Sequence, residues 1–308
     1  MKITLLFGTM SSLFAALAVG FLGAKLKLID HEFNRKLSRL LLTLIHPCMI
    51  LSSVLDKEHL LSAGQLLQLG TLAVACYVAL IPLSALLARL LHVREAERGT
   101  YRFLLSFSNI GFMGYPVAET LFGPDSAFHV TIFALVFQFV AYSVGVSLIS
   151  GGASPFRFDI KIFRRPLIVA ALLALIIYLT GFHVPQIPAG MISYVGRIST
   201  PLSMIIIGCS LADIPLGQMV GNWRVYALVG IKMVAIPILA FLLLRPFLRD
   251  PLMLGVTTVM LSMPAGTTAT TMALTYGGNE RLASSGVFVT TILSLLTIPA
   301  NLWLLFLR

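Results

Sequence analysis

Long apolar runs separated by short polar connectors follow one another along the whole chain. A helix needs about 20 mostly apolar residues to cross a bilayer. The longest polar connectors are residues 25–36, 92–100 and 150–165. The pattern predicts an all-α integral membrane protein with ten transmembrane helices and no soluble domain. The expected spans are residues 3–24, 37–55, 66–91, 101–121, 126–149, 166–182, 190–212, 223–246, 252–276 and 283–307.

Composition supports lipid as the solvent for most of the chain. Of 308 residues, 58% are apolar and 11% are charged, whereas soluble proteins carry about 25% charged residues. The apolar run after Met1 and Lys2 is longer than that of a signal peptide, so we interpret it as the first span. The three cysteines lie inside apolar runs without CxxC spacing, which indicates packing rather than a metal site or a disulfide.

The net charge of +10 is concentrated in the connectors, which argues for membrane topology and against nucleic-acid binding. Connectors that follow odd-numbered spans hold fifteen of the 22 Lys and Arg residues, and the opposite side holds six. Because positive residues favour the cytoplasm, both termini are expected outside the cell.

The two halves of the chain carry matching markers at a nearly constant offset. Pro47 and Pro201 are 154 residues apart, and Pro82 and Pro237 are 155 apart. Phe122-Gly123 and Tyr276-Gly277 are also 154 apart. With five spans in each half, the second half must enter the membrane upside down, as in the inverted repeats of secondary transporters. We therefore predict one five-helix repeat over residues 1–154 and a second, inverted repeat over residues 155–308.

The fourth span of each half contains helix-breaking residues. SFSNIGFMGYP occupies residues 106–116, and SMPAGTTATT occupies residues 262–271. Broken backbone is tolerated in a membrane only where it is buried or lines a wet cavity, so a matched pair of breaks predicts the substrate site. The alternative is a pair of ordinary proline kinks with close-packing glycines. The half-helix after each break would direct its positive N-terminal end toward an anion.

These motifs resemble those of the auxin efflux carrier family. The resemblance rests on NIGFMGYP followed by LFGP, and on MPAGTT followed by ALTYGGNERLASSGVFVTTILSLLTIP. IHPCMI in span 2 and STPLSM in span 7 extend it over essentially the whole chain. The family includes plant auxin exporters and bacterial carriers of organic acids. Residues 150–165 are far shorter than the central loop of the plant exporters, so the chain is similar to the compact prokaryotic type, which implies a bacterial inner membrane.

The resemblance implies broken helices 4 and 9 that cross at Pro116 and Pro264, and elevator-type alternating access. It also implies a scaffold of spans 1, 2, 6 and 7, a transport unit of spans 3–5 and 8–10, and a homodimer formed through spans 2 and 7. From the motifs and the expected depths of polar residues, the candidate substrate-binding residues are Asn109, Gly111, Gly114, Pro116, Gln138, Pro264, Gly266, Thr267 and Thr268. For Gln138, a helix–helix hydrogen bond is an equal alternative.

Three further polar residues within the spans are candidates for coupling or gating. Glu119 is either a proton-coupling carboxylate or gate, or a residue that reaches water near the end of its span. His46 is either a pH sensor or a hydrogen-bonded packing residue. Lys232 is either a counter-charge for an anion, or a cation that snorkels or pairs with Asp213.

Enzyme motifs such as HExxH and GxxxxGK[ST] are absent from the sequence, and no cofactor or resident metal is indicated. The sequence favours a secondary transporter of small organic anions, with export driven by a proton gradient or the membrane potential. The first alternative is a sodium-coupled symporter resembling the bile-acid symporters, with sodium near Thr270 and Thr271. The second is a non-transporting membrane sensor.

Overall fold

The computed structural model describes residues 3–55, 62–152, 163–212 and 222–306. Apart from one isolated bridge, its regular structure is helical. The first half comprises α1 (Ile3–Lys25), α2 (His31–Leu40), α3 (His46–Leu55), α4 (Ala63–Leu90), α5 (Glu95–Ser106), α6 (Tyr115–Phe122), α7 (Ser126–Val140) and α8 (Val146–Ile149). The second half comprises α9 (Pro166–Thr180), α10 (Gln186–Gly196), α11 (Ser199–Ala212), α12 (Trp223–Val229), α13 (Ile236–Leu244), α14 (Pro251–Ser262), α15 (Thr268–Tyr276) and α16 (Glu280–Phe306).

The helices follow the apolar runs that the sequence pattern identified. Six of the described helical segments are both long and apolar enough to cross a bilayer: His31–Leu55, Ala63–Leu90, Ser126–Ile149, Gln186–Ala212, Trp223–Leu244 and Glu280–Leu305. Three shorter apolar helices are Ser11–Lys25, Pro166–Thr180 and Pro251–Ser262. The all-helical fold of the described residues is therefore confirmed and is consistent with a membrane protein, and the number of ten spans stays a prediction. The boundary between the repeats at residues 154 and 155 lies outside the described residues.

Three prolines each follow a widened, π-helical turn. These turns are Leu41–Ile45 before Pro47, Ile110–Gly114 before Pro116, and Gly230–Ala235 before Pro237. In each, the residue just before the proline donates its N–H to the carbonyl five residues back. A proline has no N–H, and its ring clashes with the preceding turn. The wider turn keeps the helix continuous past the proline.

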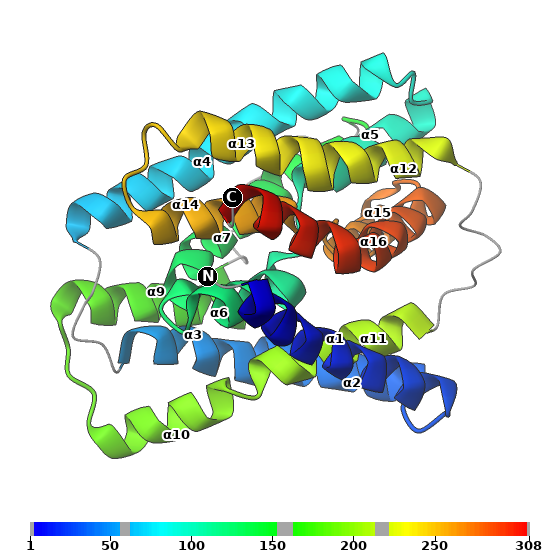
Figure 1. Ribbon diagram of the computed structural model, residues 1–308. Coiled ribbons are helices and arrows are strands. Elements are labelled where there is room, and N and C mark those ends of the chain that lie inside the picture. The colour runs from blue at the N-terminus through cyan, green and yellow to red at the C-terminus, as the bar shows by residue number, and fades with distance from the viewer. Residues whose placement is uncertain (1–2, 56–61, 153–162, 213–221, 307–308) are drawn as a thin grey trace.

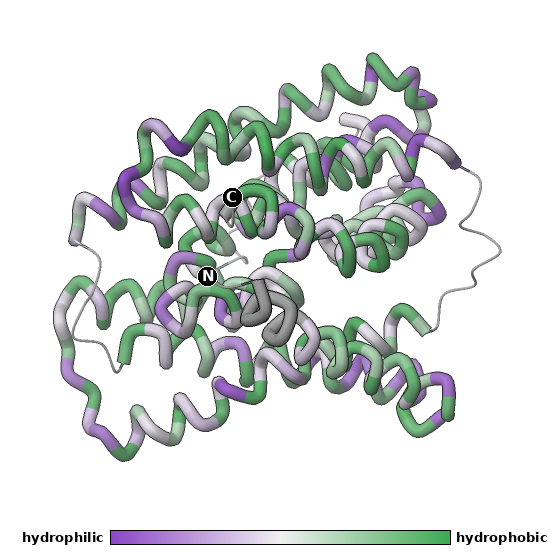
Figure 2. The backbone as a smooth tube through the Cα atoms, in the orientation of Figure 1, coloured by the Kyte–Doolittle hydropathy of each residue, from purple (hydrophilic) through white to green (hydrophobic). Residues whose placement is uncertain are grey.

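Hydrophobic residues predominate along the helices, and hydrophilic residues gather at turns and helix ends (Figure 2). On α13, for example, Leu239, Leu242 and Leu243 are more than half exposed. Lipid would cover such a surface in a membrane, where there is no water to satisfy open backbone groups.

The helices form two groups (Figure 1). In the first group α1 packs along α11, and α3 packs against α9 and α10. The second group contains α4, α5 and α12 to α16, while α6 and α7 contact both groups. The contact between α1 and α11 is close enough to require glycine, since a Cβ at Gly20 or Gly208 would collide with backbone of the facing helix.

Candidate functional site

Two short extended segments interrupt the helices of the two motifs and pair with each other. Ser108, between α5 and α6, forms an isolated antiparallel bridge with Ala265, between α14 and α15. The Asn109 N–H donates to the Pro264 carbonyl at 2.8 Å, and the Gly266 N–H donates to the Phe107 carbonyl at 3.0 Å. Four freed backbone groups are thus satisfied between the two breaks, as a membrane interior requires.

This crossing corrects the position predicted for the first break. Pro264 does lie at the crossing, but Pro116 lies in the first turn of α6, seven residues after Asn109. The π-helical turn Ile110–Gly114 compensates for the missing N–H of Pro116. Pro116 therefore does not break the helix. Neither Pro116 nor Gly114 lines either of the two cavities described below; Gly114 packs against Met260 of α14.

A different neighbour stabilises each break. The ammonium group of Lys232 donates to the Leu105 carbonyl and to Ser108 Oγ, both at 3.1 Å. Lys232 is only 2% exposed, so it does not snorkel, and it places a positive charge at the C-terminal end of α5. In the other break, the Ala265 N–H donates to Thr290 Oγ1 of α16 at 3.1 Å. The alternative partner of Lys232, Asp213, lies outside the described residues.

Asn109 offers an amide donor beside the crossing. Its Oδ1 accepts the Phe112 N–H at 3.3 Å. Because a backbone N–H can only donate, this bond identifies the other end of the amide as the NH₂ group. That nitrogen, Nδ2, is buried, since Asn109 is only 3% exposed, and it has no hydrogen-bond partner among the described residues. Asn109 therefore presents an unused donor, which suits an acceptor-rich ligand.

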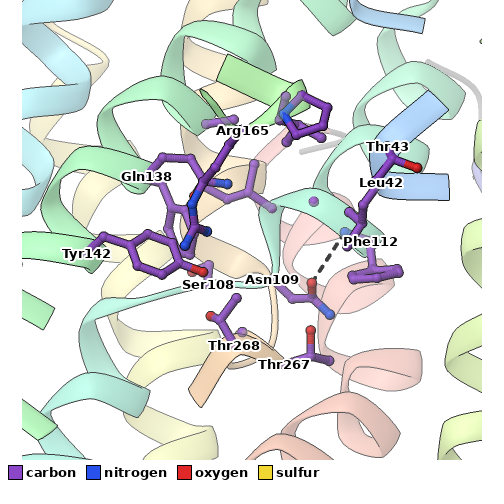
Figure 3. A pocket seen from close by; sticks show the side chains of 17 residues that line it. Leu42, Thr43, Ser108, Asn109, Phe112, Gln138, Tyr142, Arg165, Thr267 and Thr268 are labelled. Carbon is purple, nitrogen blue, oxygen red and sulfur yellow. Dashed lines mark hydrogen bonds between the residues drawn. The ribbon is translucent and has the colours of Figure 1, made fainter. Parts of the chain in front are cut away.

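A cavity of about 200 Å³ opens at the crossing (Figure 3). Pockets for drug-sized ligands have about 300–1,000 Å³, so this cavity fits a small solute. Besides Asn109 Nδ2, two side-chain atoms of its lining, Gln138 Oε1 and Thr268 Oγ1, are buried without a partner among the described residues. Six of the predicted residues line it: Asn109, Gly111, Gln138, Gly266, Thr267 and Thr268.

Gly266 leaves room where the two breaks approach. A Cβ at this position would lie 3.2 Å from both the Ser108 carbonyl oxygen and Thr268 Oγ1. A side chain here would therefore require Ser108 or Thr268 to shift by a few tenths of an ångström.

A second cavity of about 400 Å³ shares Asn109, Thr267 and Thr268 with the first. It also reaches Thr270 and Thr271, the residues of the predicted sodium site, and Thr291 of α16. Thr270 Oγ1 already donates to the Thr267 carbonyl at 2.8 Å. The described residues contain no cluster of three or more His, Cys, Asp or Glu side chains with metal-binding geometry.

Sequence reasoning missed one cationic residue and one aromatic residue of the first cavity, Arg165 and Tyr142. Arg165 stands at the N-cap of α9, and Tyr142 lies in the π-helical turn Ala141–Gly145 after α7. The Arg165 guanidinium carbon lies 3.5 Å from the centroid of the Tyr142 ring. In the sequence, Arg165 contributed only to the charge of a connector, and no local signal links it to Tyr142.

His46 and Glu119 lie outside both cavities. The His46 ring is fully buried with its centroid 5.6 Å from that of Tyr115, and both ring nitrogens lack a hydrogen-bond partner among the described residues. His46 is thus a packed residue, but the expected hydrogen bond is missing. Glu119 is half-buried, and its Oε2 accepts a hydrogen bond from Thr200 Oγ1 of α11 at 2.7 Å. This bond joins the half-helix after the first break to the group that contains α1 and α11.

Comparison with known proteins identifies the family. The profile described as "Membrane transport protein" matches twice, over residues 5–158 and 153–302. An "Uncharacterized transporter" of Methanothermobacter thermautotrophicus is 26% identical over 297 residues, covering 96% of each chain. A second "Uncharacterized transporter", from Methanocaldococcus jannaschii, is 24% identical over 295 residues, with 93% of this chain and 94% of that protein covered. A "Putative malonate transporter" of Rhizobium meliloti is 26% identical over 315 residues, with 97% of this chain and 95% of that protein covered. The chain therefore belongs to the membrane transport protein family, the auxin efflux carrier group that its motifs resemble.

Proposed function

We propose that this transporter moves small organic anions such as mono- or dicarboxylates by secondary active transport, with the substrate bound at the crossing. The observation that carries the proposal is the cavity beside the paired breaks, where Asn109 Nδ2 is an unused buried donor. The N-terminal end of α15, at Thr267 and Thr268, faces the same cavity and favours negative charge. The relative named for malonate is consistent with a small carboxylate.

The helix contacts support an inverted repeat over residues 1–154 and 155–308. If each span corresponds to the span five places later, α1 of span 1 corresponds to α9 of span 6, and α3 of span 2 corresponds to α11 of span 7. The pairs α1–α11 and α9–α3 are then equivalent, and both pairs are in contact. The same holds for α4–α5 with α13–α14, for α4–α7 with α12–α16, and for α5–α16 with α14–α7. This pattern is the one expected of two repeats related by a two-fold axis, and five spans in each repeat would place that axis in the membrane plane.

Alternating access would follow from movement of the crossing relative to the scaffold of spans 1, 2, 6 and 7. The cavity lies where such movement would expose it, because Leu42, Thr43 and Leu167 of the scaffold line one part of it. Glu119, hydrogen-bonded to Thr200 across the two groups, is the proposed proton-coupling or gating residue. An inside-negative potential favours anion export by about 2.3 kcal/mol per charge per 100 mV.

The test is uptake by proteoliposomes of a panel of mono- and dicarboxylates, with proton, potential and sodium gradients imposed separately. We expect accumulation of a small carboxylate that responds to the proton gradient or the potential. Failure of the wild-type protein to move any carboxylate of the panel would contradict the proposed substrate class.

A sodium-coupled symporter is the second candidate. The observation in its favour is the second cavity, whose hydroxyl-bearing residues Thr270, Thr271 and Thr291 adjoin the substrate cavity. Sodium prefers such neutral oxygen ligands in broken membrane helices. Accumulation driven by the sodium gradient alone would select this candidate. Family membership favours both transport mechanisms over a non-transporting sensor.

We also propose a homodimer that forms through spans 2 and 7 in the inner membrane, with both termini outside. Ile187, Met191 and Tyr194 give α10 an exposed apolar face that suits a second copy. Cysteine cross-linking at Met191 in membranes tests the dimer. Compartment-sensitive reporters at each terminus test the orientation, and a cytoplasmic N-terminus would contradict it.

A further inference from the structure

The cavity has a cationic wall that is separate from the amide and hydroxyl groups of the crossing. Arg165 reaches into the cavity from the start of α9, with its guanidinium beside Tyr142 and Gln138 (Figure 3). It is half-buried, and its face stacks on the Tyr142 ring at 3.5 Å. Stacking occupies the face of a guanidinium but leaves its in-plane N–H donors available. Among the described residues, no carboxylate forms an ion pair with it.

The position of Arg165 is held from two directions. Its backbone carbonyl accepts the N–H groups of Ile168 and Val169, both at 3.0 Å, which anchors it to the first turn of α9. The Tyr142 ring then orients the guanidinium. A planar, oriented guanidinium matches the two oxygens of one carboxylate, whereas a mobile surface arginine does not.

The neighbouring arginine provides an internal contrast. Arg164 is exposed and lines neither cavity, although it differs from Arg165 by one position in the chain. Both residues contribute equally to the charge of the connector. Only Arg165 is placed to contact a solute at the crossing.

A second wall, formed by the crossing, attracts anions by different groups. Asn109 Nδ2 and Thr268 Oγ1 are buried there without partners in the described part of the chain, and α15 begins beside them. A solute with one carboxylate would satisfy either wall and leave the other unused. A solute with two carboxylates on a short spacer would satisfy both, and the cavity of about 200 Å³ is small enough to keep such a solute in contact with both walls.

We propose that Arg165, oriented by Tyr142, binds one carboxylate of a short dicarboxylate while Asn109 and Thr268 bind the other, so that Arg165 determines the preference for dianions. This inference rests on the proposed function and deepens it by naming the substrate class. Arg165 belongs to the group of α3 and α9, and Asn109 belongs to the crossing, so the bound dianion bridges the two groups of helices.

The test compares malonate with malonamate, in which one carboxylate is replaced by a neutral amide of similar shape. Uptake of malonate and its inhibition by malonamate are measured for wild type, Arg165→Gln, Arg165→Lys and the matched control Arg164→Gln. Arg165→Gln is expected to raise the KM for malonate by about 30-fold or more, because it removes one partner of a charge pair in a half-buried site. The inhibition constant of malonamate should rise far less, so the preference for the dianion collapses.

Arg165→Lys keeps the charge but loses the planar fork, so it should give an intermediate KM. Arg164→Gln should match wild type, which excludes a general effect of connector charge. The thermal unfolding midpoint without ligand, measured for each variant, separates binding from folding. An unchanged ratio of malonate to malonamate affinity in Arg165→Gln would overturn the inference alone. Absence of carboxylate uptake by the wild-type protein would instead overturn the proposed function on which it rests.

Discussion

The two breaks meet at the same bridge but are built differently. The break of span 4 is followed by the π-helical turn Ile110–Gly114, and a buried cation, Lys232, satisfies the end of the helix before it. The break of span 9 is followed directly by α15, and a neutral hydroxyl, Thr290, accepts from its backbone. The positions of the prolines also differ, because Pro264 lies in its break and Pro116 lies beyond its own.

The difference shows that equivalent breaks in two halves need not have equivalent chemistry. The first break supplies a charged support and an oriented amide, Asn109. The second supplies hydroxyls and the positive end of a short helix. An anion at the crossing would therefore receive a directed hydrogen bond from one break and a helix dipole from the other.

The largest effect is expected at Asn109. Asn109→Asp keeps an oxygen to accept the Phe112 N–H, so the local fold should persist. It replaces the unused donor with a negative charge, which repels an anion by several kcal/mol. Uptake of carboxylates by proteoliposomes should fall at least about 100-fold.

Thr268→Val is the matched variant in the second break. It removes one neutral hydroxyl and leaves the start of α15 in place, so uptake should fall about 5- to 10-fold. Equal losses in the two variants would contradict the asymmetry between the breaks.

Lys232→Met should produce the largest loss of stability. It leaves the Leu105 carbonyl and Ser108 Oγ without the ammonium donor inside the protein. The free energy of unfolding should fall by about 1–3 kcal/mol, as measured by thermal or chemical unfolding in detergent. Lys25→Met is the control, because Lys25 also donates to a helix-end carbonyl, that of Ala212, but from a partly exposed position. Its effect should stay below about 1 kcal/mol.

Thr290→Val tests the neutral support of the second break. It preserves shape but removes the acceptor of the Ala265 N–H, so the unfolding free energy should fall by about 1 kcal/mol. Thr291→Val is the neighbouring control, since the Thr291 hydroxyl donates only to the carbonyl of Val287 in its own helix. A loss at Thr290 as large as that at Lys232 would contradict the distinction between a charged and a neutral support.

The smallest effect on substrate affinity is expected at Thr200. Thr200→Val removes the hydrogen bond to Glu119 that joins α6 to α11, at a cost of about 0.5–1.5 kcal/mol. Substrate affinity should be unchanged, because Glu119 lines neither cavity. The rate of carboxylate exchange should change by up to about 10-fold, because this bond stabilises one arrangement of the two groups. A change in affinity with an unchanged exchange rate would place Glu119 in the binding site instead.

Most of the fold could be predicted from the sequence, because lipid restricts spanning backbone to helices and the apolar runs mark where they lie. Pro264 marked the break of span 9 correctly, because a proline has no N–H to donate within a helix. The break of span 4 could not be located from Pro116, because a π-helical turn absorbed the effect of that proline. The bridge between Ser108 and Ala265 joins residues far apart in the chain, and only tertiary packing places them together.

Some residues of the candidate site could likewise be predicted from the sequence, and others could not. Asn109, Gly266 and Thr268 could be predicted because they belong to the broken motifs themselves. Arg165 and Tyr142 could not, since their stacking depends on how α9 packs beside α7. The hydrogen bond from Lys232 to the Leu105 carbonyl could not be predicted, because the two residues lie in different spans.

The central claim is that a carboxylate binds at the crossing of the two breaks. Ligand-induced stabilisation measures this directly, because a ligand at 100 times its Kd stabilises the folded state by about 2.7 kcal/mol. Malonate, titrated into purified wild-type protein and into Asn109→Asp, should raise the thermal unfolding midpoint of the wild type only, although the two proteins unfold at similar temperatures without ligand. Equal stabilisation of both proteins by malonate would show that the carboxylate binds elsewhere and would contradict the account.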